Sequence, residues 1–249
     1  MKVFCFLFVF IFFIIDAQAV LKSNIKSSVE GIDIPNAHII ASTPKSAIIR
    51  GMEPYEDLHY KQLLDFGVKH ILVFKQESQN EVDKELKKLF EIGFLKADMS
   101  NFHHISFKWK DQLDFSVSCL KTLKALSIII KAYKDDESLF FHCTSGEDRT
   151  GYLAALFRYL QKPRITPQHL FQTEMCARAY GAANKMKSNA VIQSIRKELT
   201  PVFMKMMFLI KNDLIAYDNL DINACAYDFN SSKEFGKSEF INPELFYCE

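Results

Sequence analysis

The amino-acid sequence predicts an α/β fold: a central parallel or mixed sheet flanked by helices, with a helical C-terminal extension. Two observations carry this prediction. Short apolar runs rich in β-branched and aromatic residues alternate along the chain with longer segments of helical periodicity. The run at 68–74 is continuous and β-rich, which is typical of a strand buried on both faces of a parallel sheet. A length of 249 residues suits one domain with an appendage better than two domains.

The N-terminal residues have the pattern of a signal peptide. Lys2 supplies the positive start, residues 3–15 form an apolar stretch, and Ala17-Gln18-Ala19 is a small-x-small cleavage site. The apolar stretch is shorter than the ~20 residues of a membrane span, and an uncleaved anchor is the alternative. We therefore assign residues 1–19 to a signal peptide. We expect export to a periplasm or the medium, with no stable membrane span after cleavage.

The first half of the mature chain is predicted to contain most of the sheet. β-rich runs predict strands at 37–41, 47–50, 68–74, 94–97 and 102–108. Helical spacing predicts helices at 55–66 and 81–92, each followed by a glycine, Gly67 or Gly93, in the usual C-terminal position. Residues 22–34 are polar and rich in serine, so we expect a loosely held lead-in.

The second half is predicted to be mainly helical. A long amphipathic helix is expected at 113–133, with an inward stripe made of Leu113, Val117, Leu120, Leu123 and Ile130. A strand at 138–141 and helices at 152–160, 166–179 and 185–217 follow, the last broken near Pro201. The tail from residue 218 is polar and acidic. We expect it to pack on the domain only if its cysteines dock there or if its apolar residues do, namely Phe240, Leu245 and Phe246.

The residues that carry chemistry lie between the strand at 138–141 and the next helix. They read His142-Cys143-Thr144-Ser145-Gly146-Glu147-Asp148-Arg149-Thr150-Gly151. A strand, a tight loop with glycine and a helix start form an anion site, because loop amides turn inward and the positive end of the helix dipole faces the bound group. A cysteine at the entrance and an arginine at the exit add a nucleophile and a bidentate clamp.

This string resembles the HC-x5-R-[ST] signature of the cysteine-dependent protein tyrosine and dual-specificity phosphatases. Its fuller form is similar to the HC-x-x-G-x-D-R-T-G string of a bacterial branch. Residues 49–54 resemble the R-G-x-x-P segment near the start of many dual-specificity domains. The resemblance covers roughly residues 34–185. It implies a cysteine phosphatase domain at 20–185, with 186–249 as a helical extension and tail packed on the same domain.

The loop residues have separate expected roles. Cys143 is the nucleophile, its thiol activated by the helix N-terminus and by Arg149, which also holds two phosphate oxygens. Thr150 is placed to donate its hydroxyl to the Cys143 sulfur when the phosphocysteine is hydrolysed. The resemblance implies that His142 positions the loop, and a plain core histidine is the alternative. Gly146 lets the backbone turn where a side chain would block the anion. The other positions of the phosphate-binding loop are Thr144, Ser145, Glu147 and Asp148.

A general acid is expected at the same edge of the sheet as the loop. Asp111 follows the strand at 102–108, and Trp109-Lys110-Asp111 is similar to the Trp-Pro-Asp loop of the tyrosine phosphatases, with lysine in the proline position. Asp111 is therefore the predicted acid. Asp114, three residues further on, is the nearest rival, and Asp148 is a third candidate.

These patterns predict a protein phosphatase that hydrolyses phosphotyrosine, with phosphoserine and phosphothreonine as secondary substrates, through a phosphocysteine and without cofactor or metal. Glu147 and Asp148 are expected at the rim, where they would repel a multiply charged inositide. The net charge of +1 gives no reason to expect nucleic acid as a partner. A rhodanese-like sulfurtransferase and a non-catalytic phosphoprotein-binding module are the alternatives.

The mature chain contains five cysteines: Cys119, Cys143, Cys176, Cys225 and Cys248. With the nucleophile set aside, four remain, which suits zero, one or two disulfides. Their pairing cannot be deduced from sequence alone. Cys225 with Cys248 is the pair to test first, because both lie in the loop-rich tail.

Overall fold

The computed structural model describes residues 23–76, 80–95, 99–161 and 164–248. The predicted signal peptide lies outside these residues. A five-stranded mixed sheet lies at the centre, in the order β1-β2-β5-β3-β4. Its strands are β1 (His38–Ser42), β2 (Ala47–Gly51), β3 (Val68–Val73), β4 (Phe102–His104) and β5 (Ser138–His142). β1 is antiparallel to β2 and the other neighbouring pairs are parallel, which confirms the predicted fold class.

The register of the sheet brings three strand ends together. His142 at the end of β5 pairs with Gly51 of β2 on one side and with Val73 of β3 on the other. The carboxyl ends of the parallel strands therefore lie at one edge, with β5 in the middle. In such sheets, binding sites form at this edge.

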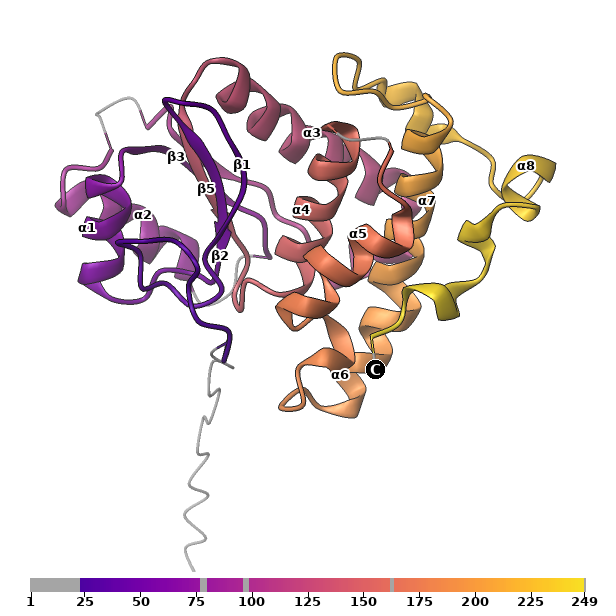
Figure 1. The fold of residues 1–249 in the computed structure, drawn as a ribbon, viewed down its shortest axis with the longest axis horizontal. Coiled ribbons are helices and arrows are strands. Elements are labelled where there is room, and N and C mark those ends of the chain that lie inside the picture. Colours follow the sequence, from indigo (N-terminus) through magenta and orange to yellow (C-terminus); the bar gives the residue numbers. More distant parts are fainter. Residues whose placement is uncertain (1–22, 77–79, 96–98, 162–163, 249) are drawn as a thin grey trace, which may run out of the picture.

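Helices cover both faces of the sheet (Figure 1). One face packs against α1 (Asp57–Asp65) and α2 (Glu81–Glu91), and the other packs against α3 (Phe115–Lys134) and α4 (Asp148–Gln161). Strand residues alternate between the two cores: Leu139 and Phe141 of β5 face α3 and α4, and Phe140 faces the opposite core. The sheet is thus buried on both sides, as expected.

Two predicted strands are wrong in part. No strand forms at 94–95, because the Phe94 and Leu95 amides both donate to the Leu89 carbonyl and close the end of α2. The rest of that predicted strand includes residues outside the described part of the chain. The strand predicted at 102–108 ends at His104, since its partner β3 ends at Val73, and the chain then enters a 3₁₀ turn, η1 (Trp109–Leu113).

The inward face of α3 also differs from the prediction. Leu113 precedes the helix and is 75% exposed, and Leu120 is 45% exposed. Asp114 caps the helix, with its carboxylate accepting from the Val117 amide at 3.2 Å. The buried stripe includes small and polar residues that hydrophobicity does not reveal: Ser118, Cys119, Thr122 and Ala125.

The chain after α4 forms a helical layer on the outer side of α4 (Figure 1). It contains α5 (Pro167–Glu174), the short turns η2 (Cys176–Arg178) and η3 (Gly181–Ala183), α6 (Asn189–Ser194), the π turn η4 (Ile195–Leu199) and α7 (Thr200–Lys211). The break predicted near Pro201 is the π turn that joins α6 to α7. Pro201 itself lies in the first turn of α7, where a missing amide proton costs nothing.

The lead-in and the tail both pack on the domain. Val29, Ile32 and Ile34 are buried against the face that carries α1, so the expectation of a loose lead-in is wrong. The tail forms η5 (Ile222–Ala226), α8 (Lys233–Gly236), η6 (Glu239–Ile241) and η7 (Pro243–Phe246). Phe240 and Phe246 are fully buried in the core beside α7, whereas Leu245 is 42% exposed.

Two disulfides hold the tail, and neither is the expected Cys225–Cys248 pair. Cys119 of α3 bonds to Cys225, and Cys176 of η2 bonds to Cys248. The fold brings η5 against α3 and the chain end against η2, so each tail cysteine meets a helical cysteine instead of its sequence neighbour. Cys143 stays a free thiol.

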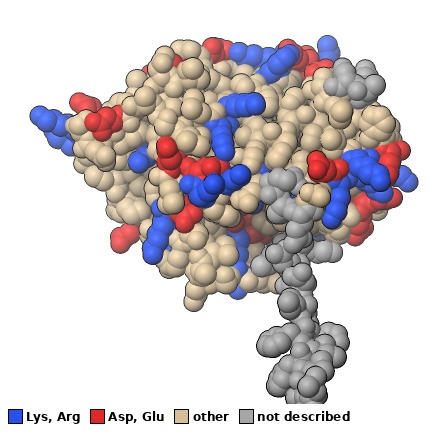
Figure 2. Space-filling model, turned by 180° about the vertical axis from the view of Figure 1, so that it is seen from behind, with Lys and Arg blue, Asp and Glu red and all other residues tan. Residues whose placement is uncertain are grey.

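The described surface has no dominant charge on the face seen in Figure 2. Lysine and arginine side chains lie beside aspartate and glutamate side chains across this face. This mixture agrees with the net charge of +1. In the described part of the chain, no helix is both long and apolar enough to cross a membrane.

Candidate active site

The loop at 142–151 occupies the sheet edge between β5 and α4. The helix begins at Asp148, four residues earlier than predicted, because the Gly151 amide already bonds to the Glu147 carbonyl at 2.8 Å. Gly146 has φ +69°, and a Cβ there would lie 2.3 Å from the Gly51 carbonyl oxygen. A side chain at 146 would therefore strike the end of β2, and not the anion as expected.

Cys143 lies at the base of the loop and is buried. Its amide donates to the Thr150 hydroxyl oxygen at 2.8 Å. Burial alone would raise the pKa of the thiol, but the charge of Arg149 and a hydrogen bond from the Thr150 side chain outweigh it. The pKa of Cys143 therefore lies below its ordinary value, which favours the reactive thiolate.

Arg149 is half-buried at the other end of the loop. One guanidinium nitrogen donates to the Phe107 carbonyl at 3.3 Å, and the guanidinium lies 5.4 Å from the centre of the Trp109 ring. Phe107 lies just before η1, and Trp109 is the first residue of η1. Arg149 thus connects the loop at 142–151 to the turn that contains Asp111.

His142 belongs to a buried polar pair beneath the loop. Its Nε2 lies 2.9 Å from Glu85 Oε1, and its Nδ1 lies 3.0 Å from the Cys143 carbonyl oxygen. Burial lowers the pKa of the ring, but the charge and hydrogen bond of Glu85 outweigh it, so the pKa is raised. The ring therefore links Glu85 of α2 to the backbone of Cys143.

Glu147 and Asp148 do not face the rim of the loop, so that expectation is wrong. Glu147 is fully buried and accepts from Asn184 at 3.0 Å and from Lys187 at 2.9 Å. Asp148 accepts from the Gly181 amide at 2.9 Å and from Lys187 at 2.7 Å. Both carboxylates are drawn away from the anion site by one buried lysine, so they give no reason to exclude a polyanionic substrate.

Two residues that the sequence analysis did not single out brace the loop from below. Arg50 is fully buried in β2 and donates to the Gly146 carbonyl at 2.8 Å and to the Glu174 carbonyl at 2.5 Å. Asn36 donates to the same Gly146 carbonyl at 3.0 Å. Burial lowers the pKa of Arg50 to about 10. Arg50 is the arginine of the R-G-x-x-P segment at 49–54, and this motif is the sequence feature that could have indicated its role beneath the loop.

The structure separates the three candidate acids. Asp111 lies in η1, where its carboxylate accepts from Lys121 at 2.6 Å and from the Lys108 amide at 2.9 Å. Burial alone would raise its pKa, but these two hydrogen bonds lower it below the ordinary value. Asp114 caps α3, and Asp148 points toward Lys187. Asp111 is thus the candidate next to Trp109, the residue that contacts Arg149.

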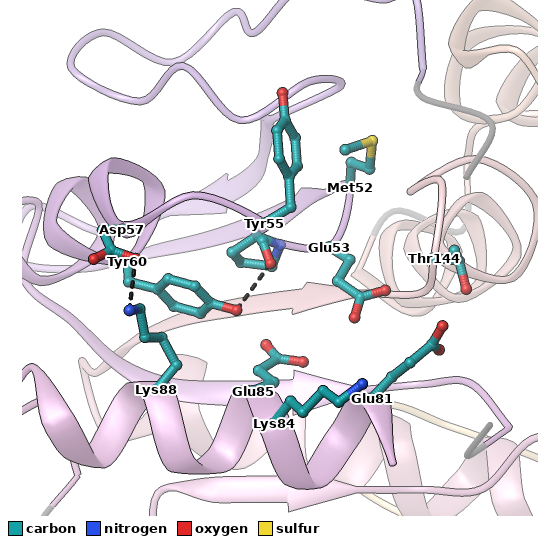
Figure 3. A pocket seen from close by; sticks show the side chains of 11 residues that line it. Met52, Glu53, Tyr55, Asp57, Tyr60, Glu81, Lys84, Glu85, Lys88 and Thr144 are labelled. Atoms are coloured by element: carbon teal, nitrogen blue, oxygen red, sulfur yellow. Dashed lines mark hydrogen bonds and ion pairs between the residues drawn. The ribbon is translucent and has the colours of Figure 1, made fainter. Parts of the chain in front are cut away.

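A cavity of about 500 Å³ opens beside Thr144 of the loop, between the segment after β2 and helix α2. Figure 3 shows Glu53, Glu81 and Glu85 around it, with Tyr60 on one side and Thr144 on the other. Burial raises the pKa of Glu53. Within the described residues, no group of three or more His, Cys, Asp or Glu side chains is placed to hold a metal ion.

The sequence model of the tyrosine phosphatase family matches residues 59–161, from α1 to the end of α4. Over these residues the chain is similar to that family, and the matched span includes the loop at 142–151. This similarity agrees with the resemblance carried by the loop string.

Three solved structures illustrate what the chain is similar to in structure. P. aeruginosa TpbA is 14% identical, with 76% of this chain and 94% of that chain covered and a TM-score of 0.47. The catalytic core of the PP-IP phosphatase SIW14 from S. cerevisiae is 20% identical, covers 65% and 83%, and has a TM-score of 0.43. PTPMT1 is 15% identical, covers 76% and 98%, and has a TM-score of 0.43. No curated protein matches in sequence.

Proposed function

We propose that this protein is a protein phosphatase that hydrolyses phosphotyrosine, with phosphoserine and phosphothreonine as secondary substrates, through a phosphocysteine at Cys143. The observation that carries the proposal is the state of Cys143: a free thiol at the N-terminal end of α4, with a pKa lowered by Arg149 and Thr150. A thiolate in an anion-binding loop is the nucleophile that phosphate ester cleavage requires.

The proposed reaction has two steps. The Cys143 thiolate attacks phosphorus, a sulfur–phosphorus bond forms and the bond to the substrate oxygen breaks. Arg149 turns its free guanidinium donors to the phosphate oxygens and neutralises their charge. Water then attacks the phosphocysteine and gives a proton to the Asp111 carboxylate. A phosphorus–oxygen bond forms, the sulfur–phosphorus bond breaks and inorganic phosphate leaves, while the Thr150 hydroxyl donates to the departing sulfur. His142, held by Glu85, keeps the Cys143 carbonyl and the loop in place.

The departing substrate oxygen needs a proton, and Asp111 is the proposed source. It lies in η1, and Trp109 of the same turn contacts Arg149. Its ion pair with Lys121 holds the carboxyl in the charged form, so Asp111 must leave this pair to take up the proton. Movement of η1 upon substrate binding would separate Asp111 from Lys121 and allow the carboxylate to take up the proton. Asp114 is the rival acid, and its substitution is the control for the assignment.

A protein substrate is favoured over a polyanionic inositide by the cavity beside Thr144. With Glu147 and Asp148 turned away, the charge beside the loop comes instead from Glu53, Glu81 and Glu85. Carboxylates in a partly buried cavity repel extra phosphate groups strongly, because the local dielectric is lower than that of water. The repulsion of an inositide that the sequence predicts from Glu147 and Asp148 is therefore assigned to these three glutamates.

The test is phosphate release from a phosphotyrosine peptide by wild type and by Cys143→Ser. The serine hydroxyl is far less acidic than the thiol, so turnover should vanish while binding of a phosphate analogue persists. If the serine variant keeps a tenth of the wild-type rate, the nucleophile is another group. Faster hydrolysis of soluble inositol phosphates than of any phosphopeptide would overturn the protein substrate, and thiosulfate sulfurtransferase activity without phosphate release would favour the rhodanese-like alternative.

We also propose that the chain is exported, as its N-terminal pattern predicts. Apart from Cys143, the four cysteines in the described part of the chain are paired in two disulfides, a usage typical of oxidising compartments. Protein recovered from its native host should begin at Val20 and contain one thiol that reacts with iodoacetamide before reduction. A chain that begins at Met1 with five reactive thiols besides Cys5 would refute export.

A further inference from the structure

The cavity beside Thr144 has a charge that the loop chemistry does not use. Glu53 and Glu81 both accept from Lys75, at 2.6 and 3.0 Å, and the Lys75 side chain is 1% exposed. One ammonium group therefore serves two carboxylates. Asp57 and Lys88, which also line the cavity, neutralise each other at 2.7 Å.

Glu85 adds a third carboxylate at the floor of the cavity. It is buried, with 3% exposure, and its Oε1 is used by His142. Its Oε2 is also buried and has no hydrogen-bond partner among the described residues. The nearby Tyr60 hydroxyl donates elsewhere, to the Pro54 carbonyl at 2.8 Å. Figure 3 shows the Glu85 carboxylate rising from α2 toward Tyr60 and Glu53.

Among the described residues, the ion pairs around this floor do not balance. Even with His142 protonated, the three carboxylates pair with two buried cations in that part of the chain, Lys75 and His142. Lys84 lines the cavity too, but it is exposed, so water screens its charge. A buried carboxylate oxygen without a donor is costly, and a cationic donor that entered the cavity would satisfy it.

We propose that this cavity is a subsite for a lysine or arginine side chain of the substrate, close in sequence to its phosphorylated residue. The proposal rests on the protein phosphatase function proposed above. The cavity adjoins Thr144, so a side chain in it belongs to a residue near the phosphate. Met52, Pro54 and Tyr60 form an apolar wall for the methylene groups, and the charged head reaches the carboxylates.

The test compares phosphotyrosine peptides that are identical except at one neighbouring position. That position carries lysine or norleucine, which keeps the side-chain length without the charge, and it is moved along both sides of the phosphotyrosine. At one position the lysine peptide should have a kcat/KM about tenfold higher, the scale of one charged hydrogen bond, mainly through KM.

Charge variants locate the effect. Glu81→Gln should reduce the lysine-to-norleucine ratio toward one, and Glu81→Lys should make it smaller than one. Asp83→Asn is the matched control, because Asp83 is exposed on α2 and does not line the cavity, so the ratio should stay at the wild-type value.

Two failures are distinguishable. Equal hydrolysis of the lysine and norleucine peptides by wild type at every position overturns the subsite and leaves the phosphatase function intact. Hydrolysis of none of the peptides overturns the proposed function and the subsite together. A ratio that responds equally to Glu81→Gln and Asp83→Asn reports a general charge effect, and this result also overturns the subsite.

Discussion

Lys187 is the residue on which the back of the loop depends. Its ammonium group lies 2.9 Å from Glu147 and 2.7 Å from Asp148, and it donates to the Ala179 carbonyl at 2.8 Å. The Lys187 side chain is 6% exposed, and those of Glu147 and Asp148 are 0% and 10% exposed. Lys187→Met keeps most of the apolar side chain but leaves two buried carboxylates without their cation.

The expected loss of unfolding free energy can be estimated from the burial of the ion pairs of Lys187. Removal of one partner from a buried ion pair costs about 3–5 kcal/mol, since the remaining charge stays out of water. Asn184 and the Gly181 amide still donate to the two carboxylates, so the lower end of this range applies. For a chain of this size, about 3 kcal/mol lowers Tm by roughly 6–12 °C.

Thermal unfolding with both disulfides intact measures the effect. Lys131→Met is the matched control, because Lys131 pairs with Asp135 on the surface, where the side chains are 76% and 43% exposed, and such pairs contribute about 0–1 kcal/mol. Adding Glu147→Gln to Lys187→Met should recover part of the loss, since the new amide needs no cation. Equal Tm changes for Lys187→Met and Lys131→Met would refute the reasoning.

Two further predictions concern the acid and the turn of the loop. Lys121→Met removes a group that lowers the pKa of Asp111, so the pKa of Asp111 should rise. Because a general acid acts only while it is protonated, the high-pH limb of the kcat/KM profile should move to higher pH. An unchanged pH profile would show that Asp111 is not the acid. Gly146→Ala should lower the free energy of unfolding by about 1–3 kcal/mol because of the positive φ, and further because the new Cβ would contact Gly51. Gly236→Ala is the control, because a Cβ at Gly236 meets open space, and thermal unfolding should show little change in stability.

The loop and its neighbours in the chain could be predicted from sequence because their signals are local. A strand, a glycine turn and a helix start follow one another within the string from His142 to Gly151, and the structure has them in that order. Gly67 and Gly93 both follow helices and both have positive φ, as helix ends prefer. Periodicity was less informative where polar side chains are buried, as at Ser118 and Thr122 in α3.

What surrounds the loop was decided by the tertiary structure. Lys187 meets Asp148 across 39 positions of sequence, Glu85 meets His142 across 57, and Cys225 meets Cys119 across 106. Local patterns say nothing of such pairs, because each depends on how whole helices pack on the sheet. The sequence by itself therefore determined where the proposed nucleophile, Cys143, and the proposed clamp, Arg149, lie in the chain. Packing decided which way the loop carboxylates point and which charged side chains lie beside the loop.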